Sequence, residues 1–383
     1  MAGQQGTLSG STNVPVKYKI ENSPEDSIRD GWVKIQDMEV EFERSFLGFE
    51  TEREAKVVHK NLSKLQGVSF LKSYFIIKHQ NQDRYWLAVD KIQYSLEKYK
   101  TEHSRIWSGL RLDSQYQDII RGIIIGMCEL HGQRHTHGRL SIKDILIVNG
   151  KPKFAFIRNE FRPPLEGDNE CETHKNNLYQ DFNDLKILFE KVIGRRENHV
   201  ELKHFYESAK VNNASGLSKL YFHPILMAPM ERFFQPVSMD TLAMYPGHEK
   251  AKKAGDCFRD VLNEETKKSY CYDWIKDVKG QKYYEKIISF EEEKKEEKKK
   301  AENKRRRGPT GESPPDLSYW HAFKVVRHAI VHINEHTKTN KKTEKDVERE
   351  LSEMFPEYFN KAYDLFKLEE IASGSRKRCG DVV

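Results

Sequence analysis

The first hundred residues alternate apolar and polar positions in a way that predicts β-strands. Strict alternation is typical of strands with one buried face, whereas apolar residues that recur every three or four positions are typical of helices. The predicted strands are residues 33–35, 38–46, 70–78 and 84–91. Residues 50–65, which lie between the strands, show helical spacing instead. We therefore expect a small unit of strands with one helix over residues 16–96.

The next part of the chain, residues 97–244, has a mainly helical pattern. Long apolar-periodic segments at residues 112–131 and 179–193 predict two of its helices. Between them, residues 137–157 contain short β-type runs around Asn149-Gly150, a dipeptide that favours a hairpin turn. A small strand-and-helix unit is thus followed by a larger helical one.

A third region, residues 245–372, also predicts helices and carries a charged insert. The helical segments are residues 247–277, 319–335 and 344–368, the last of them broken by Pro356. Within the insert, residues 285–315, the stretch 291–307 contains 6 acidic and 9 basic residues. The simplest interpretation is a solvated helix that runs into a flexible linker. A basic contact with RNA and a localisation signal are the alternatives.

Composition limits the class of protein. The termini, residues 1–15 and 373–383, offer little apolar surface to bury, and we expect both to be disordered. The 5 cysteines are odd in number and form no CxxC pair, which excludes a disulfide scaffold or a four-cysteine zinc site and favours a reducing compartment. Residues 1–17 contain no apolar core for a signal peptide, and the most apolar stretch, residues 119–130, is interrupted by Arg121 and too short to span a membrane. We expect a soluble cytoplasmic protein with no membrane or DNA partner, and the net charge of +6 permits RNA without demonstrating it.

The layout of residues 16–244 resembles a protein kinase, with an N-lobe at 16–96 and a C-lobe at 97–244. A working kinase needs a Lys on its third strand, a Glu on the next helix, an HRDxxxxN loop and a DFG metal site. Here Glu43 stands at the Lys position and Glu54 at the Glu position. An unrelated α+β domain is the alternative interpretation.

The remaining kinase positions lack the residues that catalysis and metal binding require. Residues 137–146 match the catalytic loop, with Arg139 at the position of the general base and Asp144 at that of the metal-binding Asn. An arginine cannot accept a proton at neutral pH, because its pKa lies above about 12. Phe156-Ile157-Arg158 replaces DFG and offers no carboxylate to a metal. Asp181 fits the buried aspartate that braces the catalytic loop. The resemblance therefore implies a pseudokinase that transfers no phosphate, and bound nucleotide is not expected, although a weak metal-free mode stays open.

Residues 245–368 resemble the kinase-extension nuclease (KEN) family, to which ribonuclease L and the inositol-requiring unfolded-protein sensor kinases belong. The motifs, in order, are Tyr245-Pro246-Gly247-His248 with Phe258-Arg259-Asp260-Val261, Asp273-Trp274, the run 323–335 around Arg327 and His332, and Met354-Phe355-Pro356 through Tyr363. The fold class expected for the whole chain is thus α+β, a bilobal pseudokinase followed by a small all-α KEN domain over 245–372. The charged insert 285–315 is unlike the family.

The resemblance implies a metal-independent endoribonuclease that cleaves single-stranded or loop RNA through its 2′-hydroxyl and leaves a 2′,3′-cyclic phosphate. His332 suits proton transfer because the usual pKa of histidine lies near working pH, and Arg327 suits contact with phosphate. Five residues of α-helix separate the two side chains by about 140° around the axis, so both reach one phosphate only if the helix ends between them. No cofactor or metal is needed for this reaction.

Other positions in this region allow two interpretations. His328, which replaces a family Asn, is either a second acid or base or an exposed helix residue. Trp274, Tyr319 and Trp320 either stack on RNA bases or belong to a core. The resemblance implies pairing as a homodimer, or as a heterodimer with a family member. The departures at His321, His328 and Pro314 favour the alternative function, a non-catalytic pseudokinase/KEN scaffold that regulates an active relative.

Overall fold

The computed structural model describes residues 4–9, 15–21, 27–35, 40–78, 84–159, 170–211, 213–232, 343–354, 359–360 and 363–364. The chain divides into two compact units between Tyr221 and Phe222. The boundary expected from the sequence, at 244/245, lies outside the described residues, and the two units are treated separately below.

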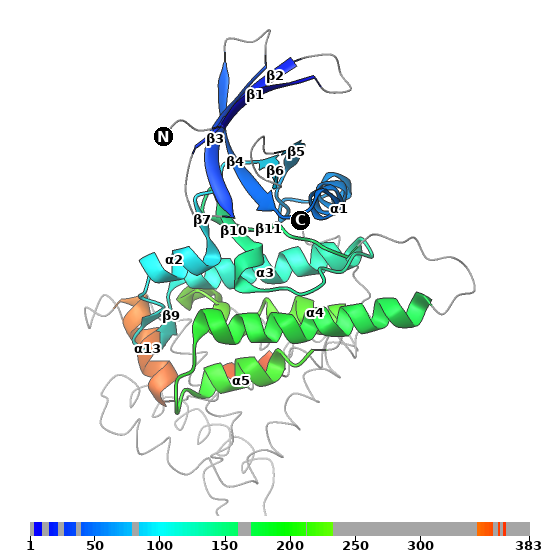
Figure 1. The fold of residues 1–383 in the computed structure, drawn as a ribbon. Helices are drawn as coiled ribbons and strands as arrows, with labels where there is room; N and C mark the ends of the chain where they lie inside the picture. Colours follow the sequence, from blue (N-terminus) through cyan, green and yellow to red (C-terminus); the bar gives the residue numbers. More distant parts are fainter. Residues whose placement is uncertain are drawn as a thin grey trace, which may run out of the picture. The chain divides into compact units, whose positions relative to one another are not determined.

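The N-terminal unit begins with a six-stranded antiparallel sheet (Figure 1), in the order β1-β2-β3-β4-β6-β5. Its strands are β1 (Gln4–Ser9), β2 (Pro15–Ile20), β3 (Ile28–Ile35), β4 (Glu41–Phe49), β5 (Ser73–Lys78) and β6 (Tyr85–Val89). Strand β1 corrects the expectation of a disordered segment at 1–15, because its backbone pairs with β2 from Gln4↔Ile20 to Ser9↔Pro15. A ladder of backbone hydrogen bonds depends little on side-chain composition.

Alternation along the strands builds the core of this sheet. Buried side chains of five strands meet on one face: Tyr18, Ile20, Val33, Phe46, Ile77, Trp86 and Ala88. In β3 the burial pattern alternates over most of the strand, as predicted from residues 33–35. Strand β4 ends in a run of buried residues, Ser45–Leu47, where it pairs with β6. A central strand is covered on both faces, which explains why its alternation stops there.

Helix α1 (Glu52–Lys64) confirms the helix predicted at 50–65. The side chain of Thr51 caps its first turn by accepting a hydrogen bond from the backbone N–H of Glu54. Its buried residues recur at helical spacing: Ala55, Val58, Asn61 and Leu62. With this face the helix packs on β4, β5 and β6, and the opposite face is left to solvent.

The rest of the N-terminal unit is mainly helical, as expected for residues 97–244. The helices are α2 (Leu96–Glu102), α3 (Ser114–Gly132), α4 (Glu170–Ile193), α5 (Val200–Ser208) and α6 (Ala214–Leu220), with the 3-10 turn η1 (Ile142–Asp144). Two small sheets accompany them, β11-β10-β7 and β8-β9. Their strands are β7 (Tyr94–Ser95), β8 (Trp107–Ser108), β9 (Arg111–Leu112), β10 (Ile145–Val148) and β11 (Lys151–Phe154).

The hairpin β10–β11 confirms the turn predicted at Asn149-Gly150. Both residues of that turn have positive φ, 51° and 73°, which is the conformation that this dipeptide favours. Helix α3 packs against β11 so closely that a Cβ at Gly126 would lie 2.4 Å from the Phe154 ring. The hairpin therefore has a fixed position beside the segment discussed below as the candidate site.

The C-terminal unit is described only in part. It contains the 3-10 turn η2 (Pro224–Leu226), helix α13 (Glu344–Met354) and helical residues at 359–360 and 363–364. Arg232, which is fully buried, pairs with the equally buried Glu348 at 3.2 Å and stacks on the Phe359 ring at 3.9 Å. Helix α13 confirms the start of the helix predicted at 344–368. No described helix of either unit is long and apolar enough to cross a membrane.

Candidate functional site

The candidate site is centred on a loop whose backbone donates hydrogen bonds to the buried carboxylate of Asp181. We call residues 135–141 the braced loop. Asp181 lies on α4 with no exposed surface, and it accepts hydrogen bonds from the backbone N–H groups of His137 at 2.8 Å and Gly138 at 3.1 Å. It also binds the His131 ring at 3.0 Å. The prediction that Asp181 is buried and braces this loop is confirmed.

A second carboxylate of α4 continues the same support. Asp184 accepts a hydrogen bond from the backbone N–H of Leu140 at 3.0 Å. Positions three apart lie on one face of a helix, so α4 presents Asp181 and Asp184 together to the braced loop. Three backbone amides of the loop are thus bound by carboxylates of one helix, and charge-assisted bonds of this kind are about twice as strong as neutral ones.

The braced loop turns sharply at Gly138 and Arg139, and Arg139 is the residue that the sequence resemblance places at the general base. Gly138 and Arg139 both have positive φ, 70° and 65°. A side chain at Gly138 would meet Asn159, since a Cβ there would lie 2.5 Å from its Oδ1. Arg139 pays a conformational cost of about 1–2 kcal/mol in this region, and its side chain is exposed. The residue that replaces the base therefore points into solvent and offers no acceptor.

The carboxylate oxygens of Asp144 are already bound by other groups of the chain. It is buried and accepts hydrogen bonds from the backbone N–H of Ser141 at 2.8 Å and from its hydroxyl at 2.6 Å. The guanidinium of Arg158 completes the set, with Nη2 at 2.8 Å from Oδ1. A cation from the stretch 156–158 therefore lies next to the carboxylate. This ion pair makes the site a poor one for a divalent metal.

The segment around Phe156 is attached to the sheet and to α1. The Phe156 ring packs against Phe49 of β4 with centroids 5.7 Å apart. The buried amide of Asn61 donates hydrogen bonds to the backbone carbonyls of Ile157 at 2.8 Å and Asn159 at 3.0 Å. Asn61 was missed by sequence reasoning, because no local pattern indicates partners that are 96 and 98 positions away in the chain.

Glu43 and Glu54 do not take part in this network. Glu43 lies on β4 opposite Trp32 of β3, and Glu54 lies in the first turn of α1; both side chains are exposed. Neither makes an ion pair with any residue that the structure describes. The structure therefore brings Asp144 together with the segment of Phe156, and leaves Glu43, Glu54 and Arg139 at the surface.

Burial controls the protonation of His137 in the braced loop. Its ring has no exposed surface and packs against Phe154 with centroids 5.8 Å apart. Within the described residues, neither ring nitrogen has a hydrogen-bond partner. Desolvation lowers the pKa of His137 below its usual 6.5, and this effect outweighs the opposing charges of Asp144 and Asp181.

The lowered pKa of His137 predicts that acid destabilises the N-terminal unit. Between the two pKa values the unfolded chain binds a proton that the folded chain does not, so the contribution to stability is complete above pH 6.5 and is lost as the pH falls below that value. Urea unfolding from about pH 8 to about pH 5 measures it. We expect a shallower pH dependence for His137→Phe than for wild type; equal slopes for the two proteins would contradict the prediction.

The Asp144–Arg158 pair predicts a measurable cost for removing the cation. The carboxylate is 3% exposed and the guanidinium 47%, so the pair lies between the surface and buried limits. We expect Arg158→Ala to lower the free energy of unfolding by about 1–2 kcal/mol. Arg195→Ala removes an arginine that is 85% exposed in its pair with Glu190 and should cost less than about 0.5 kcal/mol. Equal losses in denaturant titrations of the two variants would show that the burial of Asp144 is unimportant.

The residues expected to cleave or bind RNA lie outside the described residues. These are His332, Arg327, His328, Trp274, Tyr319 and Trp320, together with His321, Pro314 and the insert 285–315. Of the closing element, Phe359 and Tyr363 are described, and both are buried. The His223 ring lies edge-on to Tyr363 with centroids 4.8 Å apart, and burial raises the pKa of the Tyr363 phenol well above its usual value. These two aromatic residues serve as core.

Within the described part of the chain, no group of three His, Cys, Asp or Glu side chains is arranged to hold a metal ion. No protein-family model matches the chain, and a search of curated proteins finds no match either.

Proposed function

We propose that the chain is a metal-independent endoribonuclease whose N-terminal unit is a bilobal, kinase-like domain without phosphotransfer activity. The KEN-like segment 245–372 cuts single-stranded or loop RNA, with His332 in proton transfer and Arg327 on the phosphate. The kinase-like unit serves to pair two chains, so that two nuclease segments act together.

One observation supports a kinase-like unit without phosphotransfer activity: the ion pair between the buried carboxylate of Asp144 and the half-exposed guanidinium of Arg158. A phosphotransfer enzyme needs a carboxylate free to bind Mg²⁺ and a base to accept the hydroxyl proton. Here the carboxylate is bound by Ser141 and Arg158, and the position of the base is held by the exposed Arg139. The hydrogen bonds from the braced loop to Asp181 support the kinase-like architecture. The loop lacks the catalytic residues of a kinase but retains the buried aspartate that would position it.

The ribonuclease activity rests on the sequence motifs. Cleavage without metal requires a group that removes the 2′-hydroxyl proton, a group that protonates the leaving 5′-oxygen, and a cation at the phosphorane oxygens. The run 323–335 supplies His332 and Arg327 for two of these roles and His328 as a candidate for the third. The order of junction, ArgxxxxHis motif and closing element over one region supports the proposal more than any one motif does.

The test is cleavage of a labelled RNA stem-loop by the full chain in EDTA, over a range of protein concentrations. We expect the rate to rise more steeply than protein concentration, and the products to carry 2′,3′-cyclic phosphate ends. ATP hydrolysis in Mg²⁺ should be undetectable. Intact RNA at concentrations where light scattering shows a dimer would overturn the ribonuclease. That result would favour the second candidate, a non-catalytic scaffold that pairs with an active relative. The departures from the KEN-family residues at His321, His328 and Pro314 support this candidate.

A further inference from the structure

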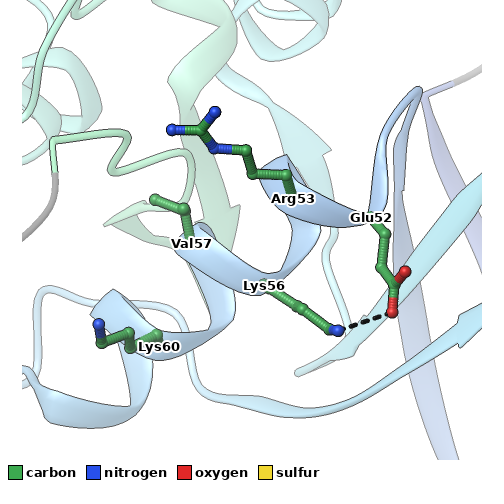
Figure 2. Close-up of a pocket in the computed structure, with 5 residues that line it drawn as sticks. All are labelled: Glu52, Arg53, Lys56, Val57 and Lys60. Atoms are coloured by element: carbon green, nitrogen blue, oxygen red, sulfur yellow. Dashed lines mark ion pairs between the residues drawn. The ribbon is translucent and has the colours of Figure 1, made fainter.

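The exposed face of α1 carries a line of cations. Successive residues of an α-helix are about 100° apart around the axis, so Arg53, Val57, Lys60 and Lys64 fall within a sector of about 60°. Figure 2 shows the side chains of Arg53, Val57 and Lys60 extending from the same side of the helix. We call these four residues the basic stripe. The acidic residues of the helix, Glu52 and Glu54, project to either side of it.

The surface along the first half of the stripe is open and only slightly hollowed. Its lining residues are Glu52, Arg53, Lys56, Val57 and Lys60. Lys56 borders the stripe and binds Glu52 at 2.8 Å, with side chains 67% and 52% exposed (Figure 2). A pair this exposed is held weakly, so Lys56 can exchange its partner for another anion at little cost.

Among the residues that the structure describes, Arg53 and Lys60 have no acidic partner. Both side chains are exposed, and neither makes an ion pair with any residue in the described ranges. The positive charge extends beyond α1, since Lys78 of β5 lies over the Tyr85 ring at 5.7 Å and its charge acts on Glu52. Two exposed cations about two helical turns apart, Arg53 and Lys60, create a positive potential on this face that attracts a polyanion.

The stripe is also a fixed platform. The buried residues of α1 anchor it on β4, β5 and β6, and Asn61 ties it to the backbone of Ile157 and Asn159. From Arg53 to Lys64 the helix rises about 16 Å, a length that spans several consecutive phosphates of a nucleic-acid strand. Because the helix fixes the spacing of these residues, only their side chains have to be ordered when they bind such a chain.

The charged insert of this chain does not fit the stripe. Residues 291–307 contain 6 acidic and 9 basic residues, which leaves an excess of 3 positive charges. Taken as a whole, a segment with that positive net charge does not complement a row of cations. The occupant must carry regularly spaced negative charge, and the polyanion that the proposed function places at this protein is RNA.

We propose that the basic stripe of α1, with Lys56 beside it, binds the phosphate backbone of the RNA substrate. This inference rests on the proposed function. Contacts of this kind position a nucleic acid without reading its sequence. The stripe therefore contributes affinity for RNA, and the KEN-like segment contributes the chemistry.

The test compares two variants that each remove three positive charges. The stripe variant is Arg53→Gln, Lys56→Gln and Lys60→Gln. The control variant is Lys151→Gln, Arg195→Gln and Lys210→Gln, which also removes one arginine, one unpaired lysine and one lysine bound to a glutamate three positions away. Binding of a fluorescein-labelled single-stranded RNA to the full chain is followed by anisotropy in EDTA, between about 50 and about 200 mM salt. All proteins carry His332→Ala so that the RNA stays intact.

We expect the stripe variant to bind RNA at least about tenfold more weakly at low salt, and its log–log salt dependence to be less steep by about 2, because each lost phosphate contact removes about 0.7. The control variant should stay within about twofold of its parent, since scattered surface charges make no shared contact. A charge-preserving variant, Arg53→Lys with Lys56→Arg and Lys60→Arg, should bind RNA as the parent does. Matching melting temperatures exclude unfolding as the cause.

Equal RNA binding by the stripe and control variants would overturn the inference, and so would loss of binding in the charge-preserving variant. A stripe that binds polyglutamate while its removal leaves RNA binding unchanged would also overturn it, in favour of an acidic protein partner. Failure of the proposed function is a separate result. RNA binding that depends on the stripe, in a protein whose wild type leaves RNA uncut, would support the inference and reject the nuclease.

Discussion

Replacement of His332 by alanine is expected to slow RNA cleavage by about 10²–10⁴-fold, because a positioned acid or base contributes a factor of that size. The measurement is the single-turnover rate on a labelled stem-loop in EDTA, with the ends of the products analysed. RNA binding should change little, since the imidazole acts on protons rather than on the phosphate backbone. A free imidazole buffer should restore part of the rate if the missing group is a proton carrier.

The matched control is His336→Ala, which removes a histidine four positions further along the chain that we expect to be exposed. It should cleave RNA at the wild-type rate. If both variants cleave as fast as wild type, His332 is not the proton-transfer group, and the resemblance at 323–335 does not extend to catalysis. Arg327→Lys separates the second role: loss of rate with the charge kept would show that the planar, bidentate guanidinium is required.

Replacement of Asp181 by alanine is expected to loosen the braced loop by about 3 kcal/mol, the lower end of the cost of breaking a buried charged contact. The carboxylate has no exposed surface, and it accepts hydrogen bonds from two backbone N–H groups and from the His131 ring. Its removal leaves these donors buried without an acceptor. We expect the amides of His137 and Gly138 to exchange hydrogen about 100-fold faster, since each tenfold corresponds to about 1.4 kcal/mol.

The control for Asp181→Ala is Asp118→Ala on α3, where the carboxylate is exposed. Its exchange pattern should match the wild type. Asp181→Asn should fall between the two, because the amide oxygen accepts a bond from one N–H while the amide nitrogen faces another donor. Unchanged exchange at His137 and Gly138 in Asp181→Ala would show that the loop is held by its packing alone.

Secondary structure could be predicted where one face of an element is buried. The predicted segments 50–65 and 112–131 are α1 and α3, and both have apolar residues at regular helical spacing on their buried face. Strand β1 was missed because its partner is the backbone of β2, which leaves no mark on composition. Helix α4 begins at Glu170, nine positions before the predicted start, because its first turns are polar.

The candidate site divides in the same way. The loss of the base at Arg139 and the place of Asp181 could be predicted, because both are matters of residue type at one position in an ordered set of motifs. The ion pair between Asp144 and Arg158 could not be predicted, although the two residues are only 14 positions apart. It depends on the backbone turn at Gly138 and Arg139 and on the hairpin β10–β11. The tie from Asn61 to Ile157 likewise required the packing of α1 on the sheet.

The sequence by itself determined those strands and helices of the N-terminal unit whose buried face has a regular period, together with the residue types available at the candidate site, because periodicity and residue chemistry act locally along the chain. Only the tertiary structure decided which carboxylates are neutralised, which amides are bound and which face of α1 is left to solvent. Those outcomes depend on partners that are distant in the chain, and a buried charge or amide takes its energy from the neighbours that folding brings to it.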